Sequence, residues 1–159
     1  MIKINTTRFG ELEVENDAII KMSRGLLGFE QNTEYVLIQH RPDTSFRWMQ
    51  STQNAALAFV VVDPGVFIDG FDFDLSDGDA EKLELSNAEE ALILVVVTIG
   101  KNGQETTANL AAPIVINSRN LVSMQVILQD SEYNVKEPIF GRVKTCENVE
   151  KENELAKAA

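Results

Sequence analysis

The sequence contains almost none of the residues that build disulfides, zinc sites and histidine-based active sites. It has one cysteine, Cys146, and one histidine, His40, among 159 residues. A single cysteine excludes an intrachain disulfide and suits a reducing compartment. A zinc site would have to take most of its ligands from carboxylates, which is uncommon. We therefore expect no metal and no cofactor.

Long apolar runs are also missing. The longest, Ala91 to Val97, is far shorter than the roughly 20 residues that a membrane helix needs. The stretch from Met1 to Gly10 lacks the apolar core and cleavage site of a signal peptide. These absences predict a cytoplasmic protein that does not bind a membrane.

Positive charge is scarce. The chain contains 14 Lys and Arg residues but 25 Asp and Glu residues, and its formal net charge is −11. Proteins that bind nucleic acid or anionic membranes need Lys and Arg to neutralise phosphates. The charge therefore argues against both kinds of partner. It favours encounter with a basic protein, because opposite charges raise association rates.

Recognisable catalytic motifs are missing as well. The sequence has no Gly-x-Ser-x-Gly elbow, phosphate-binding loop or dinucleotide fingerprint. His40 follows an apolar run, a position typical of a packed or surface histidine. Paired carboxylates arise by chance in so acidic a chain and do not mark a glycosidase cleft. We predict no catalytic residues and a protein that is not an enzyme, with a carboxylate-based hydrolase as the enzymatic alternative.

Most of the chain has the residue pattern of β-strands. Apolar and polar residues alternate on both sides of Phe9-Gly10, as in an antiparallel hairpin. The runs 57–62 and 92–99 are rich in β-branched residues, which indicates strands that are apolar on both faces. Pro113 should open a strand or lie at an edge, because it cannot donate a ladder hydrogen bond. Many short strands separated by turns indicate a β-sandwich or a β-barrel. Further strands are predicted at 18–22, 35–40 and 46–50.

One short helix is predicted within 77–85. Ser76 can cap its N-terminus, and Asp77 and Asp79 suit the positive end of the helix dipole. After Arg142 the chain mixes acidic and basic residues with few apolar ones. We therefore divide the chain into a single domain over 1–141 and a charged tail over 142–159, which we expect to be flexible.

Negative charge is concentrated in residues 63–90, which we call the acidic segment. It contains ten carboxylates and one basic residue, Lys82. A calcium loop starting at Asp72 would fail, because Leu83 stands where the chelating glutamate belongs. The segment is either a solvated surface or a face for a basic partner, with Phe67, Phe71 and Phe73 anchoring it to the rest of the domain. The predicted partner-binding residues, whose aspartates we expect to be exposed, are Asp69, Phe71, Asp72, Asp74 and Asp79.

Two other residues give an alternative binding surface. Trp48 shares one strand face with Phe46, and core packing is the favoured interpretation for both aromatics. Asn109 and Asn117 are typical of turn formers, because Asn tolerates unusual backbone angles. If the acidic segment is only a solvated surface, we expect a partner to bind near Trp48 and Asn109.

Five segments occur in the order that is typical of one known family. They are 25–30 (GLLGFE), 46–51 (FRWMQS), 57–64 (LAFVVVDP), 106–117 (TTANLAAPIVIN) and 125–128 (QVIL). On these segments the chain resembles the flagellar assembly factor family, the FliW proteins. The resemblance implies a compact, partly open, mainly antiparallel β-barrel with one short helix. The chain departs from the family pattern at Ala111, where a basic residue is common.

The resemblance also implies a function. FliW proteins are non-enzymatic, cytoplasmic proteins that bind flagellin and antagonise CsrA, an RNA-binding translational repressor. Free FliW binds CsrA and so releases the flagellin message, and new flagellin then occupies FliW until it is exported. We expect such a protein to be monomeric when free and not to contact nucleic acid directly. A flagellin-binding export chaperone that binds no regulator is the alternative.

Overall fold

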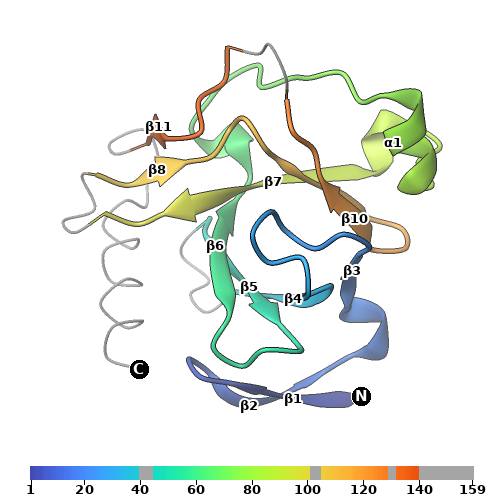
Figure 1. Cartoon of the computed structure of the whole chain (residues 1–159), viewed down its shortest axis with the longest axis vertical. Helices are drawn as coiled ribbons and strands as arrows, with labels where there is room; N and C mark the ends of the chain where they lie inside the picture. The colour runs from blue at the N-terminus through green and yellow to red at the C-terminus, as the bar shows by residue number, and fades with distance from the viewer. Residues whose placement is uncertain (40–44, 101–104, 129–131, 140–159) are drawn as a thin grey trace.

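The computed structural model describes residues 1–39, 45–100, 105–128 and 132–139 (Figure 1). Within these residues, seven strands form a closed ring in the order β7-β6-β5-β4-β3-β10-β9, and β9 pairs back onto β7. The β3–β10 pair is parallel, whereas the other pairs of the ring are antiparallel. The predicted β-barrel is confirmed, and its ring is complete where we expected a partly open one. The strands are β3 (Ile20–Met22), β4 (Glu34–Ile38), β5 (Arg47–Ser51), β6 (Ala58–Val62), β7 (Ala91–Thr98), β9 (Ile114–Asn117) and β10 (Val122–Gln125).

Short elements are added to the outside of this ring. A separate hairpin joins β1 (Ile2–Thr6) to β2 (Gly10–Val14), and β8 (Thr107–Ala108) links β7 to β11 (Glu137–Pro138). The single α-helix of the described residues, α1 (Asp77–Lys82), lies in the acidic segment. Three 3₁₀ turns within the same residues are η1 (Asn16–Ala18), η2 (Pro64–Val66) and η3 (Ala88–Glu90).

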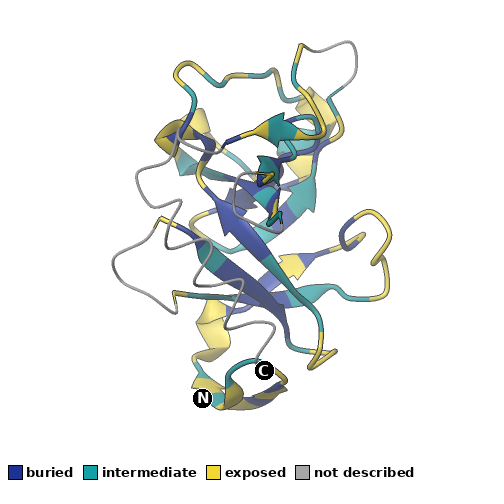
Figure 2. Cartoon of the chain, turned by 90° about the vertical axis from the view of Figure 1, so that its left-hand side faces the viewer, coloured by how far each residue is buried: buried dark blue, intermediate teal, exposed yellow. Residues whose placement is uncertain are grey.

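The barrel interior is one apolar cluster built from β3, β4, β5, β6, β7 and β9. Tyr35, Met49, Val61, Leu94 and Ile114 meet there, and none is measurably exposed. Side chains alternate between the two faces of a strand, so their chain neighbours point outward. Figure 2 shows that the buried residues run along the strands, whereas the connecting loops are mostly exposed.

Further apolar clusters cover the outside of the barrel. One lies between the β1–β2 hairpin and Val36 of β4. A second contains Trp48, Val60 and Val97, which pair across β5, β6 and β7. A third lies around Leu83, next to α1, against β9 and β10. Both faces of β6 and β7 are therefore covered, which confirms that the two β-branched runs are apolar on both sides.

Most of the predicted elements lie within a few residues of their observed positions. The hairpin pairs Ile4 with Leu12, and α1 lies inside the predicted range 77–85. β9 begins directly after Pro113, as expected. The strand predicted to begin at Ala18 begins at Ile20 instead, because a hydrogen bond from the Ala18 amide to Glu15 closes a 3₁₀ turn there. The remaining predictions, His40, Cys146 and the tail over 142–159, lie outside the described residues.

Candidate functional site: an apolar groove beside an acidic segment

The acidic segment crosses the outside of the barrel with its apolar side chains turned inward. Leu83 is 1% exposed and packs against Val115 of β9 and against Val126. Phe73 and Leu85 are half-buried in the same cluster, so the prediction that Phe73 anchors the segment is confirmed. The backbone between β6 and β7 is therefore fixed against the barrel, although most of its carboxylates are exposed.

The first half of the segment is held by a tyrosine from far along the chain. The Tyr133 hydroxyl accepts a hydrogen bond from the Asp72 amide at 3.1 Å and donates one to the Asp72 carbonyl at 3.0 Å. The Tyr133 ring lies 4.6 Å from that of Phe71, and Phe71 in turn lies 5.7 Å from Phe73. Phe67, which we also predicted to be an anchor, is 7% exposed and belongs to the cluster around Trp48.

The helix α1 begins as its sequence predicts. The Ser76 hydroxyl accepts a hydrogen bond from the Asp79 amide at 3.1 Å, and Asp77 and Asp79 lie in the first turn. A hydroxyl cap and first-turn carboxylates both stabilise a helix N-terminus. The helix ends at Lys82 and is capped by Leu83, and the next residue, Glu84, has a φ of 57°, in the left-handed region that commonly terminates helices.

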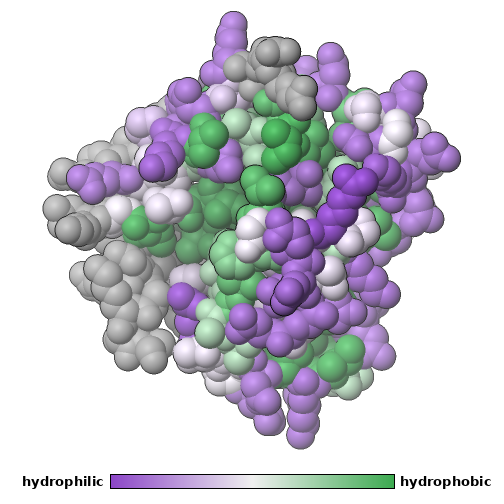
Figure 3. Space-filling view, viewed as in Figure 1, coloured by the Kyte–Doolittle hydropathy of each residue, from purple (hydrophilic) through white to green (hydrophobic). Residues whose placement is uncertain are grey.

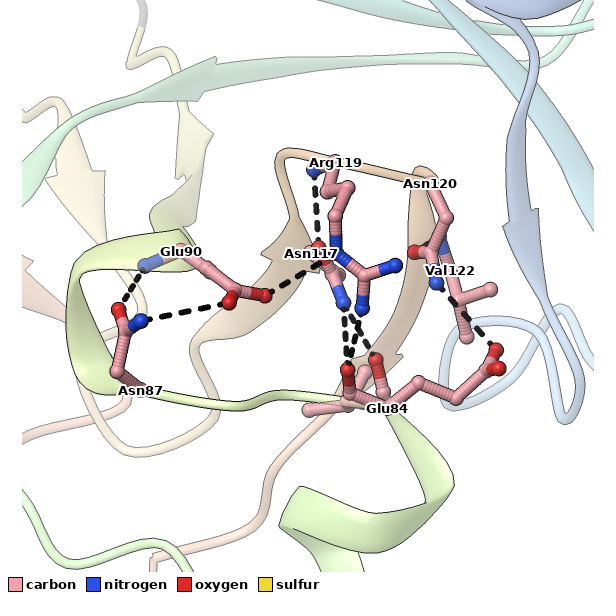
Figure 4. A network of polar contacts seen from close by, with 8 residues as sticks. Glu84, Asn87, Glu90, Asn117, Arg119, Asn120 and Val122 are labelled. Atoms are coloured by element: carbon pink, nitrogen blue, oxygen red, sulfur yellow. Dashed lines mark hydrogen bonds and ion pairs between the residues drawn. The ribbon is translucent and has the colours of Figure 1, made fainter.

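The end of α1 is fixed by a polar network from the turn between β9 and β10 (Figure 4). The fully buried Asn117 amide donates hydrogen bonds to the carbonyls of Leu83 at 2.8 Å and Glu84 at 3.2 Å. The Arg119 guanidinium donates to the same Glu84 carbonyl at 2.9 Å and lies 3.5 Å from a Glu90 carboxylate oxygen. Asn120 reaches the Glu84 side chain at 3.3 Å. These bonds satisfy carbonyls that a helix end otherwise leaves unpaired.

A groove of about 210 Å³ opens between this segment and the barrel. Its walls are mainly apolar, and Asp72 is the one charged residue among those that line it. Figure 3 shows that hydrophilic side chains cover much of this view of the molecule, with apolar side chains reaching the surface among them. The groove is lined by Phe71, Asp72, Phe73, Leu75, Leu85, Ala88, Ala91, Ile93 and Val115.

The structure brings only some of the predicted partner-binding residues together. Phe71 and Asp72 line the groove, and Asp74 follows Phe73 on the exposed side of the chain. Asp69 is also exposed but lies before the groove in the chain. Asp79, which we expected to be exposed, is half-buried in the first turn of α1, where its amide donates to the Ser76 cap.

Of the alternative residues, Trp48 lies on β5 and Asn109 directly follows β8, and neither lines the groove. Trp48 is 6% exposed in the outer cluster on β5, β6 and β7, which confirms its packing role. The Asn109 amide donates to the Val96 carbonyl, and the Asn109 side chain accepts from the Ala111 amide at 3.1 Å. Asn109 is therefore a turn former, as predicted.

The network around Asn117 was not predicted from the sequence, where Asn117 was interpreted only as a turn former. It does form a turn, because its side-chain oxygen accepts from the Arg119 amide at 2.9 Å. Its second role depends on residues more than 30 positions away. The only signal in the sequence was an asparagine at the end of an otherwise apolar strand.

Two features are absent from the described part of the chain. Among its residues, no three His, Cys, Asp or Glu side chains gather closely enough to hold a metal ion. No helix within it is long and apolar enough to span a membrane. What these residues do offer is a closed β-barrel that carries a firmly attached acidic segment and an apolar groove. This defines a small barrel protein whose distinctive chemistry lies on its outer surface.

Comparison with known proteins places the barrel in a family. The FliW protein family model matches residues 3–139. A flagellar assembly factor FliW from Syntrophus aciditrophicus is 42% identical over 139 residues, which cover 87% of this chain and 88% of the relative. The corresponding protein from Bacillus subtilis is 34% identical, over 87% of this chain and 96% of its own. The chain belongs to the FliW family of flagellar assembly factors.

A solved structure agrees with this assignment. The crystal structure of a flagellar assembly factor FliW superposes with a TM-score of 0.81 at 33% identity and covers 86% of this chain and 96% of that one. The family segment Thr106–Asn117, on which the resemblance rested, forms β8 and β9 with the Asn109 turn between them. Both strands pair with β7, so this segment completes the barrel.

Proposed function

We propose that this protein is a cytoplasmic, non-catalytic regulator that binds flagellin and antagonises CsrA. In its free form it binds CsrA, and the flagellin message is then translated. Newly made flagellin competes for the protein until flagellin is exported. The amount of free protein thereby matches flagellin synthesis to filament assembly.

Membership of the FliW family is the observation that carries this proposal. The charge of the chain supports it. Ten carboxylates and Lys82 give the acidic segment nine net negative charges. CsrA must present positive charge in order to bind RNA, so this segment would steer the two proteins together.

The attachment of the segment makes it suitable for recognition. Tyr133 holds its first half, and Asn117 and Arg119 hold its second half. The carboxylates therefore keep a nearly fixed pattern, and little conformational entropy is lost when a partner docks. The adjoining groove can accept an apolar side chain of that partner.

The same face provides a mechanism for antagonism. Once docked on CsrA, the negative charge repels RNA phosphates and lowers the affinity of CsrA for its message. This requires only a coupling free energy between the two binding events and no overlap of the two binding sites.

A pull-down with the full chain as bait, from the lysate of a flagellated host, tests both partners together. We expect flagellin and the small RNA-binding regulator to be recovered, and added flagellin to displace the regulator. Recovery of flagellin alone would favour the export chaperone instead. Absence of both partners would contradict the proposal. Turnover of a substrate that one Asp→Asn change abolishes would favour the hydrolase.

A further inference from the structure

A second groove lies on the barrel, and none of its lining residues belongs to the acidic segment. It encloses about 350 Å³ where β6 and the end of β7 lie side by side. Its walls are apolar residues of these two strands, and its charged member is Arg8 from the turn between β1 and β2. We call it the Arg8 groove. Besides Arg8, its lining includes Trp48, Phe59, Val96, Val97 and Ile99.

The hairpin turn places Arg8 firmly. The Thr6 hydroxyl accepts from the Phe9 amide and donates to the Gly10 carbonyl, both at 2.8 Å, and the Thr7 amide donates to the Ala55 carbonyl at 2.9 Å. The Arg8 guanidinium carbon lies 4.9 Å above the centre of the Trp48 ring. A guanidinium in this position is attracted to the ring face, so its orientation is set before any ligand arrives.

The hydrogen-bonding capacity of Arg8 is largely unused. Its Nη1 donates one long bond, of 3.4 Å, to the Ala56 carbonyl, and its Nε is buried without a partner. Among the described residues, no carboxylate forms an ion pair with it, although the chain carries 25 acidic residues. A guanidinium has five donors arranged to bind a carboxylate through two parallel bonds.

We propose that the Arg8 groove binds a polypeptide segment of a partner protein in which a glutamate or aspartate adjoins apolar side chains. The carboxylate accepts hydrogen bonds from the two terminal nitrogens of the Arg8 guanidinium, of which Nη1 has only the long bond to the Ala56 carbonyl. The neighbouring apolar side chains pack against Trp48, Ala58 and Ile99, which line the groove and belong to the same outer cluster. Charge complementarity selects an acidic segment, because a basic one would meet Arg8 with like charge.

This preference is opposite to that of the acidic segment, where a basic partner is favoured. The two grooves also share no lining residue. The protein therefore has two docking sites with opposite charge selectivity. The inference does not depend on the identity of either partner in the proposed function.

Trp48 gives a direct test, because it is the only tryptophan of the chain and lines the groove. The full chain is titrated with three short capped peptides, in which glutamate, glutamine or lysine is flanked by valine and phenylalanine. We expect the glutamate peptide to change Trp48 fluorescence saturably and to bind about tenfold or more tightly than the glutamine peptide, because hydrogen bonds to charged groups are the stronger ones.

Variants then locate the effect. Arg8→Gln should abolish the preference for glutamate over glutamine, and Arg8→Lys should weaken it, because lysine lacks the two-pronged geometry. Arg24→Gln, a matched change at an exposed arginine, should leave it unchanged. The comparison of peptides on the unmodified chain remains decisive if a variant does not fold. The proposal is overturned if the glutamate and glutamine peptides bind equally, or if the lysine peptide binds most tightly. It is also overturned if Trp48 fluorescence changes with protein concentration and not with added peptide, or if the preference for glutamate persists in Arg8→Gln.

Discussion

Replacing Asn117 with alanine should test how the acidic segment is attached to the barrel. The change leaves the Leu83 carbonyl without its donor, and Leu83 is 1% exposed. It also removes one of the two donors to the Glu84 carbonyl and the acceptor for the Arg119 amide. An unpaired buried carbonyl costs about 1–3 kcal/mol, and each further bond contributes about 1 kcal/mol. We therefore expect Asn117→Ala to lower the free energy of unfolding by about 3 kcal/mol.

Urea unfolding followed by Trp48 fluorescence measures this loss. With a slope of about 2 kcal/mol per molar urea, the unfolding midpoint should fall by about 1.5 M. Hydrogen exchange of the amides between Leu83 and Glu90 should also become faster, because this part of the segment would open separately from the barrel.

Asn120→Ala is the matched control. Asn120 is half-buried, and its amide reaches only the exposed side chain of Glu84, while its oxygen accepts from the Val122 amide. This change should cost about 1 kcal/mol. If Asn117→Ala lowers the midpoint no more than Asn120→Ala does, the Leu83 carbonyl has found another partner and the reasoning is wrong.

Three further predictions concern charge, pH and backbone strain. Changing Asp72, Asp74 and Asp79 together to asparagine should slow association with CsrA at low salt and flatten the salt dependence of the association rate, as measured by stopped-flow mixing. Wild-type association rates at all salt concentrations would show that this acidic face is only a solvated surface. Burial raises the pKa of Tyr35 from 10.0 to about 12, so the unfolded chain ionises first and stability should fall as pH rises through this range. Tyr35→Phe should remove that contribution from the pH dependence of urea midpoints, and an unchanged slope would contradict it. Gly25→Ala should lower the free energy of unfolding by about 2 kcal/mol or more, because the φ of Gly25 is 64° and a Cβ there would lie 2.7 Å from the Phe29 carbonyl oxygen. Gly28→Ala, also at positive φ but in open space, should lower it less. Equal falls in the melting temperatures of the two variants would refute the steric part of the argument.

Local patterns in the sequence predicted the elements whose stability is decided locally. The hairpin around Phe9-Gly10 follows from alternation, because each side chain that reaches the core must lie two residues from the next. The helix α1 follows from the Ser76 cap and the acidic first turn. The runs in β6 and β7 indicated strands covered on both faces, and the clusters inside and outside the barrel explain them.

The contacts that build the candidate site escaped prediction because they join distant parts of the chain. Tyr133 holds Asp72 across 61 residues, and Asn117 holds Leu83 across 34. The residues next to Asn117 and Tyr133 in the sequence form no pattern that predicts these distant partners. The half-burial of Asp79 was not predicted either.

The order in which the strands occur along the chain constrains how the barrel can form during synthesis. β3 to β7 are complete by Thr98, but the ring closes only through β9 and β10, which follow residue 113. Ser123 of β10 must pair with Met22 of β3, about a hundred residues earlier. A nascent chain that ends before β9 therefore carries an open sheet, with one free edge at β3 and another at β7. Such contacts of high sequence separation slow folding, and free edges invite pairing with other chains. We expect the final quarter of the chain to convert a vulnerable nascent sheet into a closed barrel.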